Sequence, residues 1–65
     1  MKIKLVVDGK ARKIDTKKST IIDLAKSHDI VLSNYIVRVN GKIVPEDEKL
    51  KDGDVIELFK VISGG

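Results

Sequence analysis

Residues 35–45 read Tyr35-Ile36-Val37-Arg38-Val39-Asn40-Gly41-Lys42-Ile43-Val44-Pro45. An Asn-Gly pair between two runs rich in β-branched residues is the strongest short-range sign of a two-residue hairpin, because both turn positions take positive φ. We therefore expect a strand over residues 35–39 and a short returning strand over residues 42–44. The returning strand should stop at Pro45, which has no N–H to donate to a neighbouring strand.

A second hairpin is predicted upstream. Residues 3, 5 and 7 are apolar and alternate with Lys2, Lys4 and Val6, the period of a half-buried strand. Asp8-Gly9 follows as a turn, because glycine takes positive φ without steric cost. The second strand should return over about residues 10–16, with Ile14 facing inward.

The apolar period changes after this hairpin. Ile21, Leu24, Ala25 and His28 follow one another at the i, i+3, i+4 and i+7 spacing of a helix face. Thr20 is the expected N-cap, and Asp23 three residues later gives an approximate capping box. The sequence therefore predicts one short helix that ends near residues 27–29.

The rest of the chain supplies one more strand. Ile30, Leu32 and Leu50 are expected to pack against the core, and Asp52-Gly53-Asp54 should turn the chain into a last strand over residues 55–61. The order β-β-α-β-β-β indicates an α+β domain with one helix across one face of a mixed sheet. We expect a single domain over residues 1–61, followed by a flexible tail over residues 62–65.

Composition excludes several classes of function. The 65 residues contain no cysteine, which removes thiolate metal sites and thiol nucleophiles. No apolar run reaches the roughly 18 residues of a membrane span. The first residues alternate instead of forming the apolar block of a signal peptide. We expect a soluble, cytoplasmic protein without a membrane partner.

The net charge of +3 is concentrated near the N-terminus. Such a basic end could bind nucleic acid or an acidic protein surface. Alternatively, its lysines keep a small sheet soluble and protect its edges. No aromatic residue lies among them to stack on bases, which favours the second interpretation. Nucleic acid is therefore not an expected partner. The basic residues up to Thr20 are Lys2, Lys4, Lys10, Arg12, Lys13, Lys17 and Lys18.

With this order of elements, the chain resembles a β-grasp, ubiquitin-like protein, and most closely the ThiS/MoaD family of sulfur carriers. It is more similar to ThiS than to MoaD, because MoaD-type chains often carry prolines before the tail and this chain has none there. The similarity is specific over the C-terminal half and is a matter of pattern over the N-terminal half. Three segments carry it: Val39-Asn40-Gly41-Lys42-Ile43-Val44-Pro45, Leu50-Lys51-Asp52-Gly53-Asp54-Val55-Ile56-Glu57-Leu58-Phe59 and Val61-Ile62-Ser63-Gly64-Gly65.

The resemblance implies a protein cosubstrate and not an enzyme. A ubiquitin-activating-type adenylyltransferase would use ATP to adenylate the Gly65 carboxylate, and a sulfurtransferase or cysteine desulfurase would supply sulfur for a thiocarboxylate. The acceptor would be a thiazole synthase of thiamin synthesis or, as second choice, a tRNA thiolase. No stably bound cofactor and no metal are expected, since ATP is used by the partner.

The terminal glycines suit this chemistry. By chance about one chain in 200 ends in Gly-Gly, so the pair alone is weak evidence of function. The domain that precedes it makes the functional interpretation stronger. Gly64 has no Cβ and allows close approach to a nucleotide. Residues 62–65, with Ile62 and Ser63 first, reach roughly 13 Å when extended.

A carrier also needs a surface for its partners. An exposed apolar group near the tail is a natural recognition point. The alternative is that Phe59 folds over the sheet edge and completes a minor cluster. The residues expected to dock partners are Phe59, Val6, Ile36, Arg38 and Lys60.

Two other functions remain open. The chain could be a covalent modifier attached to lysines through Gly65, or a non-covalent RNA- or protein-binding module that uses Lys10, Arg12 and Lys13. His28 is interpreted as structural, because no nucleophile or carboxylate partner is indicated. The acidic run at residues 46–48 lacks the ligand spacing of a calcium loop and is interpreted as solvated.

Overall fold

The computed structural model describes residues 1–60. The expected domain boundary at Val61 and the tail residues Ile62, Ser63, Gly64 and Gly65 lie outside these described residues. No helix within residues 1–60 combines the length and the apolar character that crossing a membrane takes.

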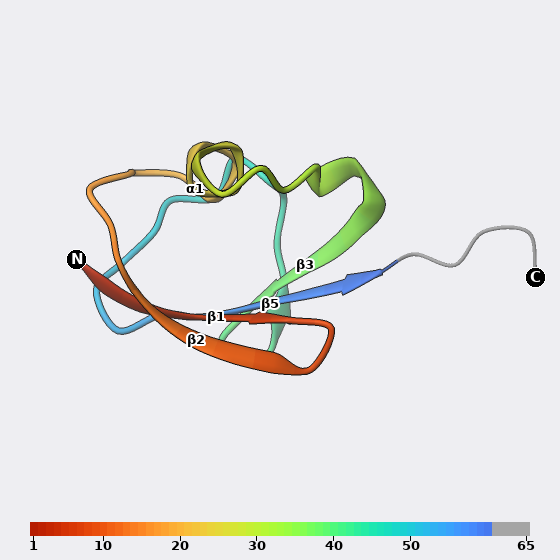
Figure 1. Cartoon of the computed structure of the whole chain (residues 1–65), viewed down its shortest axis with the longest axis horizontal. Coiled ribbons are helices and arrows are strands. Elements are labelled where there is room, and N and C mark those ends of the chain that lie inside the picture. The colour runs from red at the N-terminus through yellow and green to blue at the C-terminus, as the bar shows by residue number, and fades with distance from the viewer. Residues whose placement is uncertain (61–65) are drawn as a thin grey trace, which may run out of the picture.

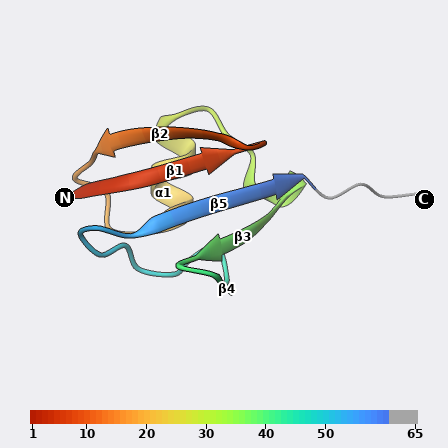
Figure 2. The same ribbon diagram turned by 90° about the horizontal axis from the view of Figure 1, so that it is seen from below.

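Residues 1–60 form one mixed sheet and one α-helix. Within this part of the chain the sheet has five strands in the order β2-β1-β5-β3-β4. The central pair, β1 and β5, is parallel, and the other pairs are antiparallel. Helix α1 lies across one face and leaves the other open (Figures 1 and 2). The predicted α+β, β-grasp class is confirmed. The elements are β1 (Lys2–Val7), β2 (Lys10–Asp15), α1 (Ile21–Ser27), the 3₁₀ turn η1 (Leu32–Asn34), β3 (Tyr35–Val39), β4 (Lys42–Ile43) and β5 (Val55–Lys60).

Both predicted hairpins are confirmed, with the turn geometry that their sequences require. Asp8 and Gly9 have φ of 51° and 80°, and Asn40 and Gly41 have φ of 51° and 85°. Two successive positive φ values match the twist of antiparallel strands. Strand β4 is one residue shorter than expected, although the Val44 N–H still donates to the Val37 carbonyl at 3.1 Å.

The start of α1 is capped from two sides. The Thr20 hydroxyl accepts from the Asp23 N–H at 3.3 Å, which confirms Thr20 as N-cap. The Ile21 and Ile22 N–H groups donate to the carbonyls of Glu48 and Glu46 at 3.0 and 2.9 Å. Helix N–H groups that have no partner within the helix are therefore satisfied by the acidic loop.

The helix end differs from expectation at His28. Helix α1 ends at Ser27, and His28 is its C-cap with an exposed side chain. His28 therefore does not continue the apolar stripe. Its backbone N–H donates to the Ala25 carbonyl at 3.0 Å, which closes the last turn.

A compact apolar core lies between α1 and the sheet. Its centre is Ile56 on β5, whose side chain is 0% exposed. Leu32 and Leu50 are buried and Ile30 packs against the core, as predicted. The buried apolar residues are Ile3, Leu5, Ile21, Leu24, Ala25, Leu32, Val37, Leu50, Ile56 and Leu58.

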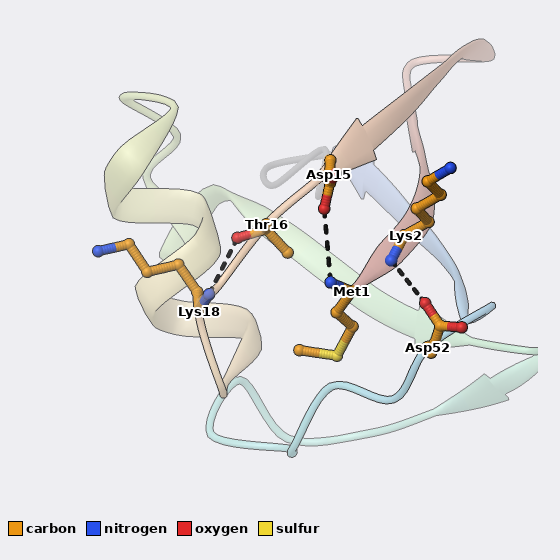
Figure 3. A network of polar contacts seen from close by, with 6 residues as sticks. All are labelled: Met1, Lys2, Asp15, Thr16, Lys18 and Asp52. Atoms are coloured by element: carbon orange, nitrogen blue, oxygen red, sulfur yellow. Dashed lines mark hydrogen bonds and ion pairs between the residues drawn. The ribbon is translucent and has the colours of Figure 1, made fainter.

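The N-terminal end of β1 is held by polar contacts (Figure 3). The Met1 ammonium lies 3.4 Å from a carboxylate oxygen of Asp15. The Lys2 N–H donates to Asp52 at 2.6 Å, and its carbonyl accepts from the Gly53 N–H at 2.7 Å. The two Lys2 bonds attach the turn before β5 to the start of β1, and so help set the register of the central parallel pair.

Replacing Thr20 with alanine should lower the free energy of unfolding by about 1 kcal/mol, because the Asp23 N–H loses its acceptor. Urea unfolding followed by circular dichroism measures this. Thr20→Ser should restore most of the loss. Ser19→Ala is the matched control, since Ser19 accepts the Leu50 N–H through its backbone carbonyl, which alanine retains. Equal losses for Thr20→Ala and Ser19→Ala would contradict the capping role.

Candidate functional site

The open face of the sheet collects most of the predicted docking residues. Val6 on β1 lies opposite Glu57 on β5, and Glu57 lies opposite Arg38 on β3. One step along, Phe59 lies opposite Ile36. Cross-strand partners point to the same face of a sheet, so these side chains share the face that α1 leaves open. Figure 2 shows the strands seen from this face, with α1 behind them.

Lys60 does not belong to this surface. It follows Phe59 in β5, and successive side chains of a strand point to opposite faces. Lys60 therefore shares the side of Ile56 and Leu58, where it is exposed at the end of the strand. The structure brings together Val6, Ile36, Arg38 and Phe59 and leaves Lys60 on the other side.

The apolar part of the open face is well exposed. Phe59 is 42% exposed and Ile36 is 43% exposed. Ile43, which the sequence analysis did not select, lies opposite Arg38 and is 75% exposed. Its position across the Asn-Gly turn was the available signal, because a two-residue turn fixes which residues face each other.

Arg38 is the most constrained side chain on this face. Its Nε and Nη2 donate to the two carboxylate oxygens of Glu57, each at 3.1 Å. Its guanidinium carbon lies 4.8 Å from the centre of the Phe59 ring, a cation–π contact. The hydrogen bond to Glu57, and then its negative charge, raise the pKa of Arg38 above its ordinary value.

Glu57 is thus a functional candidate that the sequence analysis missed. Its role depends on lying opposite Arg38. Residues 38 and 57 are far apart in sequence, so their pairing follows from strand register and not from any local motif. Together with Val6, Ile36, Phe59 and Ile43, they make up what we call the Arg38 face.

The far end of the same sheet face is basic. Lys4 lies directly opposite Lys13, and Lys2 lies opposite Asp15. These residues border a shallow hollow of about 580 Å³ that Gly53 and Val55 also line. Like charges directly opposite each other on a sheet oppose folding, and a negatively charged ligand would relieve that repulsion.

The basic hairpin considered as a binding module is divided by the sheet. Lys13 shares the open face with Lys4. Lys10 and Arg12 lie opposite Val7 and Leu5, whose side chains point to the core side. The three basic residues therefore do not form one patch, which weakens the case for a module that uses all three.

The residues that carried the resemblance have a structural role. Asn40 donates from Nδ2 to an Asp54 carboxylate oxygen at 3.0 Å, and its Oδ1 accepts from the Val55 N–H at 3.0 Å. The other Asp54 oxygen accepts from the Lys51 N–H at 2.8 Å. Asp54 is buried, so this network joins the β3–β4 turn to the entry into β5.

The acidic run does not form a metal site. Among residues 1–60, no group of three or more His, Cys, Asp or Glu side chains is placed to hold a metal ion. Glu46 and Glu48 are exposed, and their backbone carbonyls accept hydrogen bonds from the start of α1. The loop therefore acts through its backbone.

Comparison with known proteins shows which family model the sequence matches. The sequence model of the ThiS family matches residues 5–65. The chain is similar to a thiamine biosynthesis protein (ThiS) from Geobacter metallireducens, with 25% identity, coverage of 95% of this chain and 99% of that chain, and a TM-score of 0.66.

Two further solved structures show the same fold. One is a chain in the complex of subunits 1 and 2 of molybdopterin-converting factor from Helicobacter pylori, with 20% identity, full coverage of both chains and a TM-score of 0.71. The other is SAMP1 from Haloferax volcanii, with 20% identity, full coverage of both chains and a TM-score of 0.72.

The different burial of Leu58 and Phe59 predicts different losses of stability when each is replaced with alanine. Leu58→Ala should lower the free energy of unfolding by about 2–5 kcal/mol, because it opens a cavity in the core. Phe59→Ala should cost only about 1 kcal/mol, because the ring already faces solvent in part. Urea unfolding of both variants measures the difference. A loss at Phe59 as large as that at Leu58 would mean that the ring is a core residue.

The Asn40 network gives a second prediction. Asn40→Gly should cost about 2 kcal/mol, because the bonds to Asp54 and Val55 are lost while the positive φ remains accessible. Asn40→Ala should cost about 1 kcal/mol more, because alanine is strained at that φ. Urea unfolding measures both. Equal costs for the two variants would contradict the contribution of backbone conformation.

Proposed function

Since the chain belongs to the ThiS family, we propose that it is a sulfur carrier protein that acts in the cytoplasm as a cosubstrate of partner enzymes. The observation that carries this proposal is the match of the family model to residues 5–65, which includes Gly64-Gly65. The similarity in fold to a thiamine biosynthesis protein (ThiS) supports it. Gly65 is the residue that is modified.

The proposed chemistry takes place at the Gly65 carboxylate. A ubiquitin-activating-type adenylyltransferase joins this carboxylate to the α-phosphorus of ATP, which releases pyrophosphate and leaves an acyl-adenylate. Sulfur delivered as a persulfide by a sulfurtransferase or cysteine desulfurase attacks the acyl carbon and displaces AMP. Reductive cleavage of the resulting acyl disulfide by a thiol leaves the thiocarboxylate. The protein's own part is to present the terminus.

The body of the domain supports presentation in two ways. Strand β5 ends at Lys60, and the five residues that follow can take Gly65 no farther than roughly 18 Å from it. A partner that receives Gly65 therefore contacts surfaces near the end of β5. The Arg38 face includes Phe59, one residue before that end, and is the proposed docking surface.

The proposed acceptor is a thiazole synthase of thiamin synthesis. The similarity to the Geobacter metallireducens thiamine biosynthesis protein favours it over a tRNA thiolase, which is the second choice. Attachment of Gly65 to protein lysines would use the same activated terminus and would produce conjugates of higher mass.

Intact-mass measurement on protein isolated from its own cells tests the proposal. A fraction of the chains should be heavier by about 16 Da, the exchange of oxygen for sulfur at Gly65. Deleting Gly65 should abolish both this species and ATP–pyrophosphate exchange by the adenylyltransferase. The deletion should leave the free energy of unfolding unchanged, because the described core lies within residues 1–60.

Other outcomes of this experiment are informative. Ladders of conjugates that disappear with Gly65 would identify a modifier instead. A Gly65-deletion strain that makes thiamin and thiolated tRNA normally would contradict the carrier function on both branches.

A further inference from the structure

We propose that the Arg38 face receives an acidic surface of the activating enzyme, with a partner carboxylate bonded to the outer edge of the Arg38 guanidinium. This inference rests on the proposed function, because the partner is the adenylyltransferase that handles Gly65. It adds the chemistry of that partner's docking site.

Arg38 keeps several N–H donors available for a partner. A guanidinium has five N–H donors in a fixed planar fork. The bonds from Nε and Nη2 to Glu57 use two of them, which leaves three for other acceptors. Glu57 approaches from β5, so Nη1 and the second Nη2 hydrogen lie on the other edges of the fork.

Contacts within the carrier chain already hold the Arg38 side chain in place. The two bonds to Glu57 and the contact with the Phe59 ring at 4.8 Å restrict its side chain before any partner arrives. A free arginine loses rotamer freedom on binding, and this one loses less. The planar fork of arginine also matches a carboxylate in geometry, with two parallel hydrogen bonds.

Exposed apolar side chains surround Arg38 on the open face of the sheet. Val6, Ile36, Ile43 and Phe59 lie on the same face, and Ile36, Ile43 and Phe59 are substantially exposed. A partner that covers these side chains also covers Arg38, whose side chain is 39% exposed. Donors that are buried without acceptors cost free energy, so the partner must offer oxygen atoms at this point.

Charge selects carboxylates over neutral acceptors. Lys2, Lys4 and Lys13 extend the same face, next to the hollow at the other end of β1. Four basic side chains, Lys2, Lys4, Lys13 and Arg38, share the open face with two acidic ones, Glu57 and Asp15. The face is therefore net positive, and a complementary surface is acidic.

The experiment uses the purified adenylyltransferase with the full carrier chain, by titration for Kd and ATP–pyrophosphate exchange for kcat and KM. Arg38→Gln should weaken Kd and raise KM about tenfold or more, with kcat unchanged at saturating carrier. The double variant Arg38→Gln/Glu57→Gln should be equally weak, because it removes the arginine without leaving Glu57 unpaired. Raising the salt concentration should weaken the wild type more than either variant.

Lys26→Gln is the matched control. It removes one positive charge from α1, on the opposite side of the sheet, and should bind like the wild type. Recovery of wild-type affinity in the double variant would overturn the proposal, because the loss in Arg38→Gln would then come from the freed Glu57. A loss in Lys26→Gln equal to that in Arg38→Gln would also overturn it, because net charge alone would explain both.

Failure of the proposed function gives a different result. If the wild-type chain supports no ATP–pyrophosphate exchange, the carrier function fails and this inference falls with it. If the wild type is activated and both Arg38 variants match it in Kd and KM, the carrier function stands and only the docking chemistry is wrong. Circular dichroism of each variant confirms that the comparison is between folded proteins.

Discussion

The insertion of β5 between β1 and β3 is the constraint on which the rest of the structure depends. It places Ile56 and Leu58 in the core and turns Glu57 and Phe59 to the open face. Two of the three pairings among the longer strands involve β5. The Asn40 network and the Lys2 contacts with the turn before β5 both attach this strand's entry to its neighbours. A change in the register of β5 by one residue would exchange the core and docking surfaces.

Much of this fold follows from local sequence. The turns at residues 8–9 and 40–41, the cap at Thr20 and the alternation of residues 2–7 are short-range signals, and the structure bears them out. The ion pair of Arg38 with Glu57 depends on strand register between distant segments. The division of the basic hairpin and the position of Lys60 follow instead from the alternation of side chains within a single strand. No local pattern specifies which outward residue of β3 lies opposite which residue of β5. The surface could therefore be predicted as a set of exposed residues but not as an arrangement.

The proposed docking surface combines two kinds of recognition that usually compete. Exposed apolar side chains favour association with many surfaces, whereas a fixed guanidinium penalises any partner that lacks an acceptor in the right place. Placing Arg38 on the Phe59 ring joins the two, so that burying the aromatic side chain requires satisfying the arginine. In the proposed complex, specificity for the activating enzyme would arise from the free-energy cost of docking a protein that lacks this acceptor. A purely apolar face around Ile36 and Phe59 would give affinity with less discrimination.

The parallel pairing of β1 with β5 also has a consequence for synthesis of the chain. Lys4 lies opposite Val55, so β1 is synthesised long before the strand that covers its inner edge. Until then β1 and β3 present unpaired edges, and the core lacks Ile56 and Leu58. Chains that end before β5 lack these core residues and are expected not to fold. Completion of the fold thus depends on the segment that lies just before the terminal glycines.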